Sequence, residues 1–228
     1  MDSKQKIVAL VPMKLNNRRL PGKNIMRFDN GEPLCHYVLT TLLSIKEIDE
    51  VYVYCSSETI KEYIPAGVKY LKRSVELDKD TTKINEVIAA FANEIEADIY
   101  VMSHVTSPFI EAASIRNGLA AVLGGAYDSA LAVQQLATFL WKDGKPLNYQ
   151  LDNIPRTQDL PPVYAETSGF YIFKSDVIKQ LHRRIGEKPF LVQVSQTEAV
   201  DVDEKEDFLI ANAIYNQRLK QVNKKCDE

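Results

Sequence analysis

The feature that most constrains the fold is an alternation of short apolar runs with amphipathic segments over the first 125 residues. The apolar runs predict strands at residues 7–11, 51–55, 68–71 and 98–102. The segments between and after them predict helices at residues 33–45, 58–63, 83–96 and 111–123. Strand and helix in regular alternation are typical of the α/β class. We therefore predict a doubly wound, mainly parallel sheet with right-handed crossovers.

The pattern changes after residue 125. Residues 129–134 alternate like a strand, and residues 139–142 followed by a Lys-Asp-Gly-Lys turn indicate an antiparallel excursion. Further elements are expected as strands at 167–173 and 190–194 and helices at 175–184 and 204–222. Because no linker or repeat interrupts the chain, we predict a single domain over residues 1–228, with the excursion at approximately 135–165.

Composition excludes several classes of protein. The 228 residues carry 28 Lys and Arg against 31 Asp and Glu, a net charge of −3, so no global basic field predicts nucleic-acid binding. No apolar run approaches about 18 residues, so we expect no membrane span. The three cysteines Cys35, Cys55 and Cys226 form no CxxC pair, which argues against a disulfide framework or structural zinc. Together with an N-terminus that does not resemble a signal peptide, this predicts a cytoplasmic protein.

The loop after the first strand is the most informative segment. Five cations and no acid lie between residues 13 and 27: Lys14, Arg18, Arg19, Lys23 and Arg27. At the carboxyl end of a parallel strand, such a cluster suits a triphosphate, although a solvated basic loop would have the same composition. The chain contains neither GxxxxGK[ST] nor GxGxxG, which argues against P-loop hydrolases and dinucleotide dehydrogenases.

A pair of acids precedes the last expected helix. Asp201 and Asp203 are two residues apart, and an extended backbone places both carboxylates on one side. There they could hold Mg²⁺ together with phosphate oxygens and waters. The alternative is an acidic turn that, with Glu204, Glu206 and Asp207, favours a helix N-terminus.

Six segments, in order, resemble those of the cytidylyltransferases that activate acidic sugars, which make CMP-sialic acid or CMP-KDO. The first is VPMKLNNRRLPGKN at 11–24, with the family's LPGK core, and SSE follows at 56–58. LKRSVELDKDT at 71–81 is similar to R-P-x-E-L-x-x-D-T, and VTSP at 105–108 to Q-P-T-S-P. RTQDLPPVY at 156–164 is similar to R-x-Q-D-L-P-P-x-Y, and AVDVDE at 199–204 to S-I-D-I-D-T.

The resemblance implies a Rossmann-like fold and the transfer of CMP from CTP to an acidic sugar, sialic acid or a related nonulosonic acid, with release of pyrophosphate. It also implies Mg²⁺, or Mn²⁺ in its place, and a homodimer formed through the excursion, in cell-surface polysaccharide synthesis. Two alternatives stay open. The acceptor could be KDO or a phosphate or phosphonate compound, or the chain could be a nucleotide-binding relative without catalysis.

The resemblance assigns roles to individual residues. Lys23, Asp201 and Asp203 are the expected catalytic residues, and the two aspartates are the expected metal ligands. The expected nucleotide contacts are Lys14, Arg18, Arg19, Lys23, Asn24, Arg73 and Thr82. The expected acceptor contacts are His104, Thr106, Ser107, Arg156, Gln158 and Glu166. For three of these a plainer role is open: Arg73 on the surface, Thr82 as a helix cap, and His104 as a packed or surface histidine.

The chain departs from the family pattern mainly on the acceptor side. Lys14 replaces an arginine of P-A-R and cannot form its bidentate fork with phosphate. His104 replaces a glutamine, Ile110 replaces an arginine, and residues 166–169 (ETSG) replace E-N-G-A. Because LPGKN and both aspartates are intact, nucleotide handling is better supported than the identity of the acceptor.

Overall fold

A computed structural model describes the backbone of residues 4–226 and the side chains as far as Lys220. Residues 1–3 and 227–228, which the single-domain prediction includes, and the side chain of Cys226 lie outside the described part. The strands are β1 (Ile7–Pro12), β2 (Glu50–Cys55), β3 (Lys69–Lys72), β4 (Ile99–Ser103), β5 (Ser129–Leu136), β6 (Trp141–Lys142), β7 (Lys145–Pro146), β8 (Val163–Lys174) and β9 (Pro189–Gln193). The α-helices are α1 (Leu34–Leu43), α2 (Ile84–Glu94), α3 (Ala112–Leu123), α4 (Ser175–Leu181) and α5 (Lys205–Cys226). None of the helices within this part is long and apolar enough to cross a membrane.

Seven strands form one sheet in the order β3-β2-β1-β4-β8-β5-β9. All neighbours pair in parallel except β8, which runs antiparallel to both β4 and β5. The prediction of a mainly parallel, doubly wound sheet is confirmed. The carboxyl ends of β1, β2 and β4 share one edge, and the reversed β8 brings the N-terminal half of its own strand there, because Phe170 pairs with Ser103. This edge is where ligands bind in open α/β sheets.

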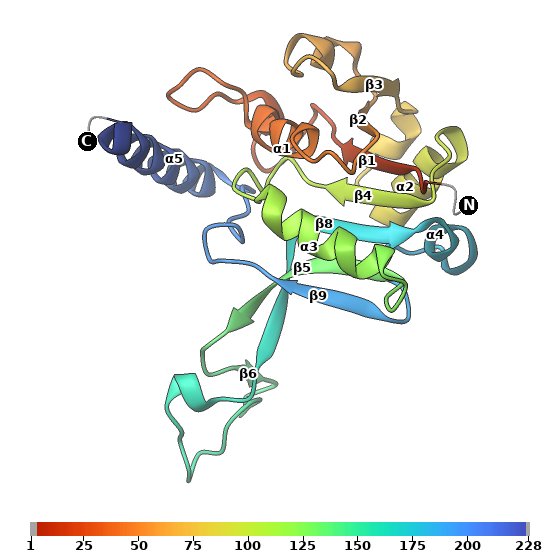
Figure 1. Ribbon diagram of the computed structural model, residues 1–228. Helices are drawn as coiled ribbons and strands as arrows, with labels where there is room; N and C mark the ends of the chain where they lie inside the picture. Colours follow the sequence, from red (N-terminus) through yellow and green to blue (C-terminus); the bar gives the residue numbers. More distant parts are fainter. Residues whose placement is uncertain (1–3, 227–228) are drawn as a thin grey trace.

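Helices cover both faces of the sheet (Figure 1). Alternate residues of β1 point to opposite sides: Ala9 and Val11 pack under α1, α3 and α5, whereas Val8 and Leu10 pack under α2 and α4. Because both sides are covered, the strand is apolar at successive positions, and all four of these side chains are fully buried. The continuous apolar runs in the sequence therefore reflect burial on both faces.

The connections differ in detail from the predictions. The segment predicted as a helix at 58–63 is a 3-10 helix, Glu58–Glu62, which is a common form for so short a connector. Further 3-10 turns lie at Lys23–Ile25, Val75–Asp78 and Thr157–Asp159. The helix expected at 83–96 is α2, and its N-cap residue is Lys83 rather than a threonine.

An arm, residues 137–162, projects from the body between β5 and β8, as Figure 1 shows. The paired ends of β5 and β8 extend into it, and the β6–β7 hairpin lies within it. Four of its apolar side chains are exposed: Trp141, Leu147, Leu151 and Ile154. The antiparallel excursion predicted at approximately 135–165 is therefore present.

Candidate active site

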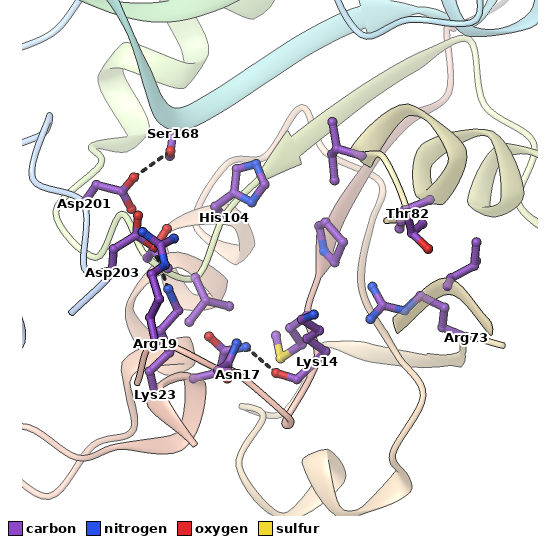
Figure 2. Close-up of a pocket in the computed structure, with 18 of the residues that line it drawn as sticks. Lys14, Asn17, Arg19, Lys23, Arg73, Thr82, His104, Ser168, Asp201 and Asp203 are labelled. Atoms are coloured by element: carbon purple, nitrogen blue, oxygen red, sulfur yellow. Dashed lines mark hydrogen bonds and ion pairs between the residues drawn. The ribbon is translucent and has the colours of Figure 1, made fainter. Parts of the chain in front are cut away.

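A cavity of about 380 Å³ opens at the sheet edge where β1 and β4 end. Most of the predicted site residues line it: Lys14, Arg19, Lys23, Asn24, Arg73, Thr82, His104, Thr106, Asp201 and Asp203. Figure 2 shows Arg19, Lys23, Ser168 and the two aspartates gathered on one side, and Arg73 and Thr82 on the other. The fold therefore brings together residues that lie up to about 190 positions apart in the sequence.

Lys23 is the most enclosed cation of the loop after β1, with 8% of its surface exposed. Gly22, at φ +69°, turns the backbone into the 3-10 helix that begins at Lys23, a conformation that glycine adopts without strain. The ammonium group donates to the backbone oxygen of Val202 at 3.0 Å and to Oδ1 of Asp203 at 2.8 Å. Lys23 thus joins the loop after β1 to the aspartate segment.

Both predicted metal ligands face the cavity. Between them Val202 is buried, and its N–H donates to the oxygen of Thr106 at 2.8 Å, which fixes the segment against the loop after β4. Burial tends to raise the pKa of Asp203, but the hydrogen bond and charge of Lys23 and the charge of Arg19 outweigh it and hold the pKa below its usual value. Asp203 is therefore ionised at neutral pH.

The acidic turn of the alternative interpretation is present at Asp207. The Oδ2 of Asp207 accepts the N–H groups of Asp203 at 3.0 Å and Glu204 at 2.8 Å at the start of α5. The carboxylates of Asp201 and Asp203 face the cavity, where they contact Ser168 and the cations Lys23 and Arg19 respectively.

The donor set fits a magnesium ion held jointly with phosphates. Oδ2 of Asp201 accepts the hydroxyl of Ser168 at 2.8 Å, but Oδ1 is buried without a partner among the described residues. A buried, unpaired carboxylate oxygen is costly unless a cation or donor meets it. Within the described part, no group of three or more His, Cys, Asp or Glu side chains could hold a metal alone. Mg²⁺ commonly takes one or two carboxylates and obtains its other ligands from phosphates and water.

Two further cations of the loop pair with one acid, Asp80, which lines an adjoining hollow. Nζ of Lys14 lies 3.2 Å from Oδ1 of Asp80, and Nη1 of Arg18 lies 2.7 Å from its Oδ2. Arg18 lines an adjoining hollow rather than the cavity itself. These pairs are largely exposed, so they are weak, and a triphosphate could displace Asp80 from both cations.

Arg73 is buried rather than on the surface, with 5% of its area exposed. Its guanidinium pairs with Asp78, which also accepts the hydroxyl of Ser56, while its Nε is buried without a partner among the described residues. Thr82 lines the cavity next to it. Asn24 is buried as well, and its amide donates to the oxygen of Lys14 at 2.8 Å. Asn24 thus fixes the backbone of the cationic loop.

His104 follows β4 and is half-buried in the cavity wall. Burial, together with the positive charges of Arg184 and Lys23, lowers its pKa to about 4. It is therefore neutral at pH 7, and can exchange hydrogen bonds with a ligand but adds no charge. Thr106 lines the same wall, whereas Ser107 is buried just behind it and its N–H donates to the oxygen of His104.

Besides Ser107, three predicted acceptor contacts lie outside the cavity. Arg156 and Gln158 are in the arm, where Nε of Arg156 pairs with Oδ2 of Asp159 at 2.8 Å, so the structure does not bring them to the cavity of the same chain. Glu166 lies on β8 and accepts from Tyr171 and from Arg184. The arm explains the position of Arg156 and Gln158, because it carries residues 137–162 away from the sheet edge.

Sequence reasoning missed three polar residues of the cavity wall: Asn17, Lys79 and Ser168. Asn17 and Lys79 lie within the loops that we singled out, so proximity to the predicted cations was a usable signal. Ser168 belongs to the ETSG segment, but its contact with Asp201 spans 33 positions. No local pattern predicts such a contact.

Solved structures share this fold. The chain aligns with a CMP:2-keto-3-deoxy-manno-octonic acid synthetase complexed with CTP over 93% of its length and 99% of that chain, with a TM-score of 0.71 and 16% identity. A 4-diphosphocytidyl-2C-methyl-D-erythritol synthase from Anaerococcus prevotii aligns over 93% and 96%, with a TM-score of 0.67 and 14% identity. The chain therefore has the α/β fold that these two structures share.

Sequence comparison gives the particular family. A profile described as cytidylyltransferase matches residues 8–225, and the chain belongs to the cytidylyltransferase family. It is 27% identical over 188 residues to an N-acylneuraminate cytidylyltransferase of Oncorhynchus mykiss, covering 78% of this chain and 43% of that protein. It is 26% identical over 215 residues to N-acylneuraminate cytidylyltransferase A of Danio rerio, covering 90% and 50%. The chain thus spans about half the length of these relatives. The predicted family and fold are confirmed.

Proposed function

We propose that the protein transfers CMP from CTP to an acidic sugar, sialic acid or a related nonulosonic acid, and releases pyrophosphate. The observation that carries this proposal is the cavity in which Lys23 and Arg19 meet Asp203 beside the unpaired oxygen of Asp201. Such a site offers cations for phosphate oxygens and carboxylates for a divalent ion. Family membership supports the use of CTP.

In the proposed reaction a hydroxyl oxygen of the sugar attacks the α-phosphorus of CTP. A bond from this oxygen to phosphorus forms, the bond to the β-phosphate oxygen breaks, and the hydroxyl proton passes to water. Lys23 and Arg19 offset negative charge on the departing phosphates, and Arg73 and Thr82 hold the other end of the nucleotide. Little covalent work is asked of the protein, so its contribution is alignment of the two substrates.

Asp201 and Asp203 would hold Mg²⁺, with Mn²⁺ as a substitute. When bound, the ion neutralises phosphate charge and fixes the triphosphate geometry. In this structure Lys23 and Arg19 contact Asp203. Binding of the ion by the two carboxylates would replace these contacts, and both cations would then be available to the phosphates.

The test is pyrophosphate release from CTP with Mg²⁺ and a panel of acceptors: N-acetylneuraminate, pseudaminic acid, KDO and a phosphonate. We expect turnover with a nonulosonic acid, and at least a 100-fold loss in Asp203→Ala, the range for removal of one transition-state contact. Glu204→Ala is the matched control, because Glu204 is exposed and adjacent.

Turnover only with KDO or the phosphonate would mean that the acceptor is not a nonulosonic acid. CTP binding without turnover on any acceptor would favour a non-catalytic relative, and full activity of Asp203→Ala would remove the metal assignment.

The proposal includes a homodimer formed through the arm. Trp141, Leu151 and Ile154 each expose more than half of their surface there, and Phe139 packs on Tyr149 with ring centroids 4.6 Å apart. A second copy would cover this surface. Light scattering after size exclusion should give twice the chain mass, and a Leu151→Glu, Ile154→Glu variant should give the monomer mass. A monomeric wild type would remove the dimer from the proposal.

A cytoplasmic location stays a prediction, consistent with the free, buried thiols of Cys35 and Cys55.

A further inference from the structure

Arg184 is a cation beside the cavity that the proposed chemistry has not used. It lies in the turn between α4 and β9, and its guanidinium carbon is 3.6 Å from the ring centroid of Tyr171. Its Nη2 donates to Oε1 of Glu166 at 2.9 Å, and the hydroxyl of Tyr171 donates to the same oxygen. The three side chains form one packed group on the side of the sheet covered by α2 and α4.

This group adjoins the wall that His104 forms. The rings of His104 and Tyr171 are perpendicular, with centroids 6.3 Å apart. The charge of Arg184 is also among the causes of the low pKa of His104, which places the guanidinium within electrostatic reach of the imidazole. Arg184 therefore adds positive charge near His104, through the ring of Tyr171 that lies between them.

The turn that carries Arg184 is held firmly by β5. The carboxylate of Asp128 accepts the N–H groups of Glu187 at 2.7 Å and Lys188 at 3.0 Å, and the hydroxyl of Ser129 accepts the N–H of Gly186 at 2.8 Å. A Cβ atom on Gly186 would lie 2.2 Å from the Asp128 carboxylate, so the close approach requires glycine. The backbone next to Arg184 is thus preorganised, as ligand-binding side chains usually are.

The guanidinium keeps donors for a ligand. It has five N–H groups in a planar fork, and the side chain retains 20% of its surface exposed. Glu166 binds Nη2 and stacking on Tyr171 fixes the plane, so the other N–H groups of the fork are held in a fixed orientation. A planar, bidentate fork is the usual partner of a carboxylate.

We propose that Arg184 binds the carboxylate of the acceptor and so makes the site selective for sugar acids. This inference rests on the proposed function, and it names the residue that would select the chemical class of the acceptor. Sialic, pseudaminic and 3-deoxy-manno-octulosonic acids all carry a carboxylate on the anomeric carbon, next to the attacking hydroxyl. Such an acceptor, placed with its hydroxyl toward the phosphates and its ring against His104, directs its acid group to this side of the cavity.

The experiment compares a sugar acid with its C1 amide as acceptors for the wild type and for Arg184→Gln. We expect kcat/KM for N-acetylneuraminate, or for whichever acid of the panel is used, to fall about 10- to 100-fold in the variant, as for loss of a charged hydrogen-bonded pair. The amide should change little, so the preference for acid over amide collapses, while KM for CTP stays constant. Arg183→Gln is the matched control, because Arg183 pairs with Glu187 on the surface.

Two further measurements distinguish a failure of this inference from a folding defect and from a failure of the proposed function. Arg184→Lys keeps the charge without the fork, and should retain part of the preference for the acid. Calorimetry in the presence of CTP measures the binding of N-acetylneuraminate, pseudaminic acid and KDO, and of the amide of each. The ratio of the two affinities gives the preference for acid over amide independently of turnover. If no acceptor reacts, the proposed function fails, but loss of acid binding in Arg184→Gln still supports the inference. Equal losses for acid and amide, or an unchanged preference, would overturn it, because Arg184 would then only support Tyr171 and Glu166.

Discussion

The two ends of the cavity are built differently. The Arg73 end (Lys14, Arg73 and Thr82) consists of loops after β1 and β3, and its cations are paired with Asp80 and Asp78. The His104 end (His104, Thr106 and Ser168) consists of the turn after β4 and the reversed strand β8, and its lining side chains are neutral. Between the ends, Lys23 and Arg19 meet Asp203.

This contrast matches the distribution of family-like residues in the sequence. LPGKN and both aspartates are intact, whereas His104 and residues 166–169 depart from the family pattern. Apart from Lys14, the charged part of the cavity follows the family pattern, whereas His104 and the segment that carries Ser168 depart from it. Nucleotide and acceptor recognition should therefore respond to different substitutions, which the following predictions test.

The largest effect is expected between the two ends. Lys23→Met removes an enclosed ammonium that binds the Val202 oxygen and Asp203, so it should lower kcat by roughly 10²–10³ whichever acid serves as acceptor. Pyrophosphate release under saturating substrates measures it. Arg18→Gln should cost much less, because the Arg18 side chain is 80% exposed. Equal losses in both variants would mean that the loop acts only through its overall charge.

An intermediate effect is expected at the Arg73 end. Arg73→Lys keeps a charge beside Asp78 but loses the planar fork and the buried Nε, so KM for CTP should rise about tenfold. KM for the acceptor should not change, because Arg73 lies away from the His104 end. Lys72→Gln, one residue earlier on β3 and exposed, is the control. If KM for the acceptor rises as well, the two ends are coupled and the contrast is lost.

Much of the fold could be predicted because burial on both faces leaves a local signal. Val8, Ala9, Leu10 and Val11 form an uninterrupted apolar run for this reason. The direction of β8 leaves no such signal, because a buried strand has the same composition whichever way it runs. The 3-10 helix at Glu58–Glu62 was predicted as a longer helix because one turn is too short to show a period.

The site was predictable where residues follow strands directly, as Lys14 and His104 do. The rest depends on long-range placement. Ser168 lines the cavity because β8 is reversed, and Arg184 stacks on Tyr171 of β8 because β5 holds the turn before β9. Arg156 leaves the site because the arm projects from the sheet, and nothing in its own segment gives that direction.

The smallest effect is expected at the His104 end and concerns stability against pH. His104 has a pKa of about 4 in the folded protein, whereas an unfolded histidine has a pKa near 6.5. Between these values the unfolded chain binds a proton that the folded chain does not, so stability falls as the pH is lowered. Relative to His104→Gln, which cannot titrate, the wild type should lose at most about 1.4 kcal/mol of unfolding free energy per pH unit below 6.5. Urea unfolding at pH 7.5 and 5.5 measures this difference.

The control is His182→Asn, because His182 is exposed at φ +54°, a conformation that asparagine tolerates. Its pH dependence should match that of the wild type. If His104→Gln also matches the wild type, then His104 has the same pKa in the folded and unfolded states, near 6.5, and is charged below that pH. Arg184 would then face a second cation under mildly acidic conditions, and either could receive a carboxylate. A weaker pH dependence in His104→Gln than in the wild type instead leaves Arg184 as the charged group beside Tyr171, with His104 limited to hydrogen bonds.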